Sequence, residues 1–283
     1  MITVTTGGSR WHQLNLWCDT WQDAERMAFA HLRPILTHAE DSGTVACWWF
    51  LRKADHWRLR LLPAHGQDET AATLVQKLPL ELAEHGAIRR WSTGIYEPER
   101  HAFGGPQAMD VAHRLFHDDS RHILAHLAAA HRDHRRELGL LLATRLMRGA
   151  AQDWYEQGDI WAQVAAHRAD QSQTMPSPTA VDAVRRFITA TADSADSPLH
   201  ITPAWPATFR TAGADLARLA EQGHLTRGLR AVLAHHILFT LNRLGIPPSQ
   251  QHQLATTAAT VVFGKRPALP SGATSGQANR RGD

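Results

Sequence analysis

Hydrophobic and polar residues alternate in short stretches of the first hundred residues, and four stretches predict β-strands. Residues 11–17 (WHQLNLW) alternate with period two, so odd and even positions lie on opposite faces. Residues 45–51 (VACWWFL) are apolar throughout, which is typical of a buried strand. Residues 56–62 (HWRLRLL) alternate large and basic side chains, and the intervening RKAD predicts a hairpin connection. Residues 87–96 predict a further strand.

Apolar positions at helical spacing dominate the remaining sequence. Thr20 followed by Asp23 resembles a capping box with the shorter carboxylate and predicts a helix start, and Pro34 predicts a kink in that helix. A second helix is predicted at about residues 69–84, and Gly245 occupies the position of a C-cap glycine. From residue 109 onward the pattern is almost entirely helical, with helices predicted at 109–116, 120–130, 136–149, 154–167, 179–192, 205–222, 226–244 and 249–263.

These patterns predict an α+β fold in which a sheet built early in the chain is covered by many helices. We expect one domain over residues 1–263. Residues 264–283 (GKRPALPSGATSGQANRRGD) are rich in Gly, Pro, Ser and Arg without a hydrophobic period, which predicts a disordered tail. Residues 171–178 and 193–203 predict surface loops.

Composition narrows the class of protein. The chain lacks both a signal-peptide pattern and any run of about eighteen apolar residues, so we expect a soluble cytoplasmic protein that does not enter a membrane. Cys18 and Cys47 form no CxxC pair and are interpreted as small buried side chains. A formal net charge of +3 permits attraction to an acidic peptide or to RNA but demands neither.

Arg58 and Arg60 are the first candidates for function. They stand two residues apart in a predicted strand, so their guanidinium groups lie on one face, where they suit a carboxylate or an amide oxygen. The alternative is a solvated face on which arginine stems cover apolar surface. Tyr96 and Glu97 end the next strand beside a glycine-rich turn (residues 94–106, GIYEPERHAFGGP), where polar groups build a site or simply occupy a loop.

The segment LFHDDSRHIL (residues 115–124) combines His117, Asp118 and Ser120. These side chains could form an acid–base cluster, because histidine titrates near neutrality and a neighbouring carboxylate tunes it. The alternative is that Ser120 or Asp118 caps the helix that follows. A metal site is not expected, because the sequence contains neither an HExxH motif nor a cysteine cluster.

The apolar helix predicted at 226–244 carries four polar residues near its end. His235 and Asn242 lie two turns apart on one face, and His236 and Arg243 lie on the neighbouring face. Such residues need partners, so this helix faces either a polar pocket or a structural hydrogen-bond network. The sequence contains no phosphate loop, dinucleotide fingerprint or kinase signature, so neither a cofactor nor nucleic-acid binding is expected.

Six segments, in this order, resemble one family. WHQLNLWC, WWFLRKADHWRLR, GIYEPERHAFGG, LFHDDS, RGAAQDWYEQGDIWAQVAAHR and HHILFTLNR look like the thiopeptide-type bacteriocin biosynthesis family, whose fold also forms the glutamate-elimination domain of lantibiotic dehydratases. The resemblance covers about residues 11–263. It implies one of two activities: elimination of glutamate from glutamylated Ser or Thr, or pyridine formation from two dehydroalanines.

Departures from the elimination pattern favour the second activity. Elimination domains keep an arginine just before the aromatic–Gly–Gly of the loop, where this chain has Ala102. They also keep a histidine four residues before the Asn–Arg pair, where this chain has Leu238. Of the charged residues that elimination domains keep, only the strand arginine is present in this chain, as Arg58. AFGG, DWYEQGD and the short chain without a glutamylation domain resemble the pyridine-synthase branch.

The resemblance implies a cofactor-independent cyclase whose partner is a modified precursor peptide with a leader, azoles and dehydroalanines. A split glutamate-elimination lyase and a non-catalytic leader-binding scaffold remain the alternatives, and the oligomeric state stays open. For proton transfer we expect Tyr96, His117, Ser120, Tyr155 and His236. For substrate binding we expect Trp57, Arg58, Arg60, Glu97, Asp118, Trp154, Asn242 and Arg243, of which the two tryptophans would stack on azole rings.

Overall fold

The computed structural model describes residues 11–53, 56–129, 134–169, 176–189, 199 and 201–264. It confirms the predicted α+β class. Four antiparallel strands form one sheet in the order β2-β3-β1-β4. The strands are β1 (His12–Trp17), β2 (Val45–Arg52), β3 (Trp57–Pro63) and β4 (Arg90–Gly94). The predicted pairing of β2 with β3 is therefore confirmed, and β2 and β4 are the two edges of the sheet.

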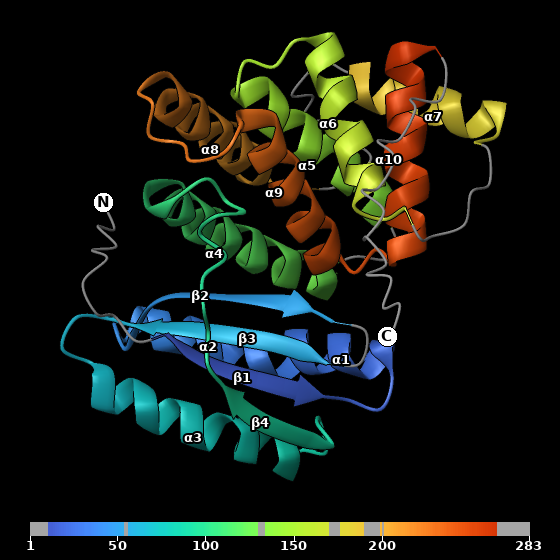
Figure 1. Ribbon diagram of the computed structural model, residues 1–283. Coiled ribbons are helices and arrows are strands. Elements are labelled where there is room, and N and C mark those ends of the chain that lie inside the picture. Colours follow the sequence, from blue (N-terminus) through green and yellow to red (C-terminus); the bar gives the residue numbers. More distant parts are fainter. Residues whose placement is uncertain are drawn as a thin grey trace, which may run out of the picture.

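One group of helices, early in the chain, lies against the sheet, and a second group stacks beyond strand β2 (Figure 1). The first group is α1 (Trp21–Met27), α2 (Arg33–Asp41) and α3 (Asp68–Glu84), with a π-helical segment, η1 (Ala28–Leu32), between the first two. α4 (Pro106–Ala129) runs beside β2 and connects the sheet to the second group. That group comprises α5 (Arg135–Gly149), α6 (Trp154–Ala166), α7 (Pro178–Thr189), α8 (Ala204–Glu221), α9 (Leu229–Leu244) and α10 (Pro248–Phe263).

Local sequence signals fix several element ends. The backbone N–H of Asp23 donates to Oγ1 of Thr20 at 3.1 Å, which confirms the predicted cap of α1. Gly245 ends α9 with a φ of +79°, a left-handed conformation that glycine adopts without strain. Pro34 lies in the first turn of α2, directly after the π-helical segment η1.

The structure corrects two predicted element boundaries, and some other predictions concern residues that it does not describe. α4 is a single helix where two helices were predicted, so Asp118 and Ser120 lie inside it and cap nothing. β4 is shorter than the predicted strand at 87–96, because residues 95–98 leave the sheet. Most of the predicted loops lies outside the described residues, as does the predicted tail beyond residue 264. The single-domain assignment remains a prediction.

Two hydrophobic clusters occupy the two faces of the sheet. The larger one contains the side chains of Leu14, Leu16, Trp48, Phe50, Trp57, Leu59 and Leu61 together with residues of the surrounding helices. The smaller one joins the opposite face to α4, α9 and the loop after β4, and contains Trp49, Leu51, Phe103, Met109, Ala112, Phe116 and Phe239. Alternation along β2 and β3 produces this division, and the smaller cluster forms the floor of the candidate site.

Candidate active site

The arginine-bearing face of the sheet holds Arg60 in an aromatic clamp. Its guanidinium carbon lies 4.2 Å from the ring centroids of both Trp49 and Tyr96. Nε of Arg60 donates to Oε1 of Gln13, its cross-strand neighbour, at 2.9 Å. Cation–π contact of this kind stabilises a desolvated guanidinium by about 2 kcal/mol. Burial lowers the pKa of Arg60 to about 10, so the group remains charged at neutral pH.

A hydrogen-bonded pair of neutral groups lies beside this clamp. Oη of Tyr96, in the loop after β4, is 2.8 Å from Nε2 of His113 on α4. Burial, reinforced by the charges of Arg60 and Arg100, lowers the pKa of His113 to about 3. Burial also raises the pKa of Tyr96 well above its ordinary value. Both groups are therefore neutral at pH 7, and the tautomer of the imidazole decides which of the two donates the hydrogen bond.

A second acid–base pair links the same loop to α9. Nε2 of His235 lies 3.1 Å from Oε2 of Glu99. The hydrogen bond from His235 lowers the pKa of Glu99, so the carboxylate is ionised at neutral pH. The rings of His167 and His235 are 6.3 Å apart, which brings the end of α6 to this side of the site. The loop residues 95–105 are thus tied to both α4 and α9.

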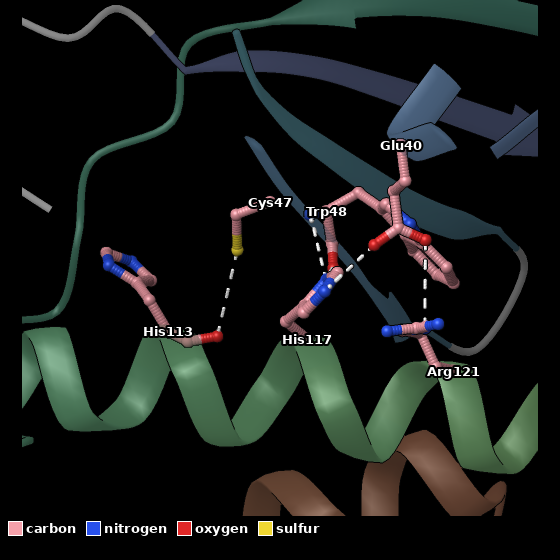
Figure 2. Close-up of polar contacts among 6 residues, drawn as sticks. All are labelled: Glu40, Cys47, Trp48, His113, His117 and Arg121. Atoms are coloured by element: carbon pink, nitrogen blue, oxygen red, sulfur yellow. Dashed lines mark hydrogen bonds and ion pairs between the residues drawn. The ribbon is translucent and has the colours of Figure 1, made fainter. Parts of the chain in front are cut away.

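His117 binds the edge strand β2 at Trp48 (Figure 2), and Ser120 binds the same strand at Phe50. Nδ1 of His117 lies 3.2 Å from the amide nitrogen and 2.9 Å from the carbonyl oxygen of Trp48, while its Nε2 lies 3.0 Å from Oε1 of Glu40. Oγ of Ser120 accepts the N–H of Phe50 at 3.3 Å. Both side chains are buried, and their polar atoms are hydrogen-bonded to the backbone of the edge strand β2. This geometry corrects the expectation that they transfer protons to a substrate.

Arg243 belongs to a buried ion pair. Its Nε donates to Oδ2 of Asp119 at 2.7 Å, and Trp205 Nε1 donates to Oδ1 of the same carboxylate at 2.8 Å. Arg243 and Asp119 both have side-chain exposures of 0%. The expectation that Arg243 binds substrate is therefore wrong. Its guanidinium is paired with Asp119, and this contact links α9 to α4 and, through Trp205, to α8. Oγ1 of Thr240 accepts a further hydrogen bond from Nη2 of Arg243 at 3.2 Å.

His236 lies in the core instead of the site. Its ring centroid is 4.9 Å from that of Phe103 and 6.0 Å from that of Phe116, and neither ring nitrogen has a hydrogen-bond partner among the described residues. Burial, followed by the charges of His235 and Arg243, lowers its pKa to about 3. The expected proton-transfer role of His236 is therefore corrected, and its neighbour His235 is the histidine that faces polar groups.

Several other expected residues lie elsewhere. Trp57 is buried on the opposite face of the sheet, where its ring stacks on Phe50 at 4.5 Å, so it is not available to azole rings. Trp154 and Tyr155 lie at the start of α6, whereas the other end of this helix, next to His167, lies at the candidate site. The two ends are about 20 Å apart, because α6 has 13 residues. Tyr155 is 67% exposed and does not join Tyr96. Glu97 is exposed and Asp118 half-buried, whereas Oδ1 of Asn242 accepts hydrogen bonds from Arg168 and Gln251.

The comparisons identify the family. The sequence model described as lantibiotic biosynthesis dehydratase C-term matches residues 11–262. The chain belongs to this family. The assignment confirms the resemblance to this dehydratase-related family that was inferred from the six sequence segments. Among curated proteins, none matches the sequence significantly.

Three solved structures share the fold. The tRNA-dependent lantibiotic dehydratase MibB from Microbispora sp. 107891 matches with a TM-score of 0.65 and 16% identity over 93% of this chain, which spans 29% of MibB. The pyridine synthase TbtD from thiomuracin biosynthesis matches with a TM-score of 0.63 and 15% identity over 89% of this chain and 97% of TbtD. TsrL matches with a TM-score of 0.62 and 15% identity over 92% of this chain and 100% of TsrL.

Sequence reasoning missed several residues that this member of the dehydratase C-terminal family brings into the site. His113 stands one helical turn before His117, and Glu99 stands two residues after Glu97, so both lie beside segments that were singled out. The sequence predicted that His235 shares a helix face with Asn242, but it did not predict the contact of His235 with Glu99. Gln13, His167 and Arg168 carried no local signal, because their partners are distant in the sequence.

The described part of this family member shows no metal cluster and no membrane span. Within residues 11–264, excluding the gaps, no group of three or more His, Cys, Asp or Glu side chains is placed to hold an ion. None of the helices described there combines the length and the apolar character that crossing a bilayer requires. The polar groups described above at the candidate site are those of Tyr96, His113, Arg60 and the His235–Glu99 pair.

Proposed function

We propose that this chain is a pyridine synthase that acts on a modified precursor peptide. Two dehydroalanines of one peptide combine in a formal [4+2] aza-cycloaddition, after one backbone amide becomes an imidic acid and supplies a 2-azadiene. The first ring product then loses water, and the leader leaves as its C-terminal amide. The reaction is redox-neutral, because both losses are eliminations. The neutral Tyr96–His113 pair beside Arg60 is the observation that carries this proposal.

Amide tautomerisation needs a proton donor and a proton acceptor on adjacent atoms. Tyr96 gives its proton to the amide oxygen, and the proton lost from the amide nitrogen returns to the Tyr96–His113 pair, so both groups end neutral. The Arg60 guanidinium, 4.2 Å from the phenol ring, stabilises negative charge on either oxygen during the transfer. General acid–base help of this kind is worth roughly 10²–10⁴-fold in rate.

Orientation of the two dehydroalanines supplies the remaining acceleration. Holding two reacting groups of one molecule in register contributes on the order of 7–11 kcal/mol in favourable cases. The buried aromatic cluster that contains Trp49, Phe103 and Phe239 packs against Tyr96 and holds its phenol in position. His235 with Glu99 then serves the later eliminations, because an imidazole held by an ionised carboxylate can accept and return a proton.

One observation favours a second candidate, the glutamate-elimination lyase. Nη1 of Arg227 donates to the carbonyl oxygen of Ala102 at 3.1 Å, so a guanidinium lies next to the loop position at which elimination domains keep an arginine. A lyase would also need a histidine to replace Leu238, which is buried. His235 stands one turn earlier on the same side of α9, but Glu99 already engages it. The geometry therefore supports the pyridine synthase better.

Mass spectrometry of one reaction tests the proposal. The protein is incubated, without added cofactor, with a synthetic leader–core peptide that carries two dehydroalanines and flanking thiazoles. We expect the leader to appear as its C-terminal amide and the core to be lighter by that leader and one water. Unchanged peptide despite measurable leader binding would overturn the proposal and favour the non-catalytic scaffold.

A further inference from the structure

The loop of residues 95–105, between β4 and α4, carries two groups of the candidate site. Tyr96 near its start contacts His113 on α4, and Glu99 contacts His235 on α9. Both contacts are made by side chains, so their geometry depends on where the backbone of the loop lies. The second half of the loop is held by the connection between α8 and α9, residues 222–228.

Two hydrogen bonds join this connection to the loop. Nη1 of Arg227 donates to the carbonyl oxygen of Ala102 at 3.1 Å, and the backbone N–H of Thr226 donates to the carbonyl oxygen of Gly104 at 3.0 Å. The first bond comes from a charged donor, and charged donors form stronger hydrogen bonds than neutral ones. It also comes from a side chain, so a substitution at position 227 removes it and leaves the bond of Thr226 in place.

Two glycines let the loop backbone pack directly on the connection and on α9. Gly104 has a φ of +89° and Gly105 a φ of +108°, conformations that residues with a side chain rarely adopt. A Cβ atom on Gly104 would lie 2.9 Å from Cγ2 of Val232, and one on Gly105 would lie 3.1 Å from Cγ2 of Thr226. The two segments are therefore closely packed beside the carbonyl group that Arg227 binds.

A backbone turn links the position of Ala102 to that of Glu99. The N–H of Phe103 donates to the carbonyl oxygen of Glu99 at 3.1 Å, and the N–H of Gly105 donates to that of Arg100 at 2.7 Å. These bonds fold residues 99–105 into one compact unit. A displacement of the backbone at Ala102 therefore moves Glu99 as well.

Arg227 also lies next to the helix that carries the partner of Glu99. α9 begins at Leu229, two residues after Arg227, and His235 lies in its second turn. The half-buried side chain of Arg227 thus ties the segment that bears Glu99 to the start of the helix that bears His235. One side chain couples the two halves of the acid–base pair.

We propose that Arg227 is a positioning residue that holds the loop so that Glu99 meets His235. This inference rests on the proposed function, in which that pair serves the later eliminations, and adds a residue to it. Arg227 acts through Glu99 and does not itself exchange protons with the substrate. Such positioning affects the rate strongly, because a displacement of about 1 Å can lower it roughly 10²-fold.

Three variants separate this role from a general effect on the fold. Arg227→Gln removes the charged donor, and Arg227→Lys keeps the charge but replaces the planar guanidinium by a compact ammonium. Arg230→Gln is the matched control, because Arg230 is exposed three residues further along the chain and pairs with Asp159. Hydrogen exchange of the full chain, followed by mass spectrometry, measures the protection of residues 99–105 without any substrate. Steady-state kinetics of leader release from the dehydroalanine peptide gives kcat and KM separately.

We expect Arg227→Gln to speed exchange in residues 99–105 roughly tenfold and to leave exchange in the sheet unchanged. It should lower kcat roughly 10²-fold with little change in KM, because the peptide still binds but the carboxylate of Glu99 is displaced. Arg227→Lys should recover part of both effects. Arg230→Gln should match the unaltered protein in both measurements.

Unchanged exchange of residues 99–105 in a folded Arg227→Gln protein overturns the inference, and so does faster exchange with kcat unchanged. A rise in KM with unchanged exchange also overturns it and makes Arg227 a substrate-binding residue. The exchange measurement is independent of the cyclisation assay. An unaltered protein that leaves the dehydroalanine peptide unchanged loses the proposed function, and faster exchange in Arg227→Gln then still assigns Arg227 to holding the loop.

Discussion

The phenol oxygen of Tyr96 lies 2.8 Å from Nε2 of His113, although 17 positions separate them in the sequence. One residue comes from the loop after β4 and the other from the middle of α4, so the pair forms only when the sheet and the helices are assembled. Both groups are neutral at pH 7, because burial lowers the pKa of His113 to about 3 and raises that of Tyr96. In the proposed function, this contact is the reactive part of the site.

Replacing the phenol tests this relationship. Tyr96→Phe should lower the rate of ring formation roughly 10²–10⁴-fold, because it removes the proton donor and leaves the ring that packs on Arg60. Peptide binding, followed by fluorescence anisotropy, should change little. Tyr155→Phe is the matched control, since Tyr155 is 67% exposed at the far end of α6. Similar losses in both variants would contradict the assignment.

The buried histidines predict how stability depends on pH. His113 and His236 have folded-state pKa values of about 3, below the value of 6.5 for an unperturbed histidine. The unfolded chain therefore binds more protons as the pH falls from 6.5 towards 3. The free energy of unfolding should decrease over this window by up to about 1.4 kcal/mol per pH unit for each histidine.

Urea unfolding of His236→Phe at pH 7.5 and 5.5 measures that slope. The variant should lose less stability than the unaltered protein on acidification, because one buried titrating group is gone. His101→Gln, at an exposed position, should keep the original slope. A slope for His236→Phe that matches the unaltered protein would show that this imidazole is not buried in its neutral form.

The Asp119–Arg243 pair should dominate the stability of the helical region. Arg243→Met leaves the carboxylate of Asp119 buried without its counter-ion, and such losses cost about 3–5 kcal/mol. Arg218→Met removes one partner of an exposed pair and should cost below about 1 kcal/mol. Chemical denaturation of both variants measures the contrast. Equal small effects would mean that Asp119 and Arg243 are not paired in the interior.

Ser120 separates a structural role from a catalytic one. Ser120→Ala leaves the buried N–H of Phe50 without an acceptor, which should cost about 1–3 kcal/mol of stability. The rate of ring formation at saturating peptide should stay within about threefold of the original, since Ser120 is buried against β2. A loss of rate comparable with that of Tyr96→Phe, in a protein that remains folded, would restore the acid–base interpretation.

Elements set by local patterns could be predicted from the sequence. Period two in residues 56–62 and the apolar run at 45–51 predicted β3 and β2, and Thr20 and Gly245 predicted helix ends. The break predicted inside α4 was wrong, because the polar run around Asp119 indicated a cap. Those side chains instead satisfy partners on other elements, namely β2, α8 and α9.

The site was harder to predict for the same reason. Polar residues of similar type stand side by side in the sequence, and burial decides between them. His235 faces Glu99 while His236 is buried among phenylalanines, and Glu99 makes the contact that Glu97 does not. Alternation placed Arg58 and Arg60 together, but only the assembled fold shows that Trp49 and Tyr96 enclose the second of them.

The most direct test of the account is a competition reaction followed by mass spectrometry. The protein receives equal amounts of a leader–core peptide with two dehydroalanines and of a matched peptide in which one serine carries a glutamyl ester. The account predicts that the first peptide loses its leader as an amide together with one water, while the second stays intact. Loss of glutamate from the second peptide with the first unchanged would contradict it and assign the chain to the lyase activity.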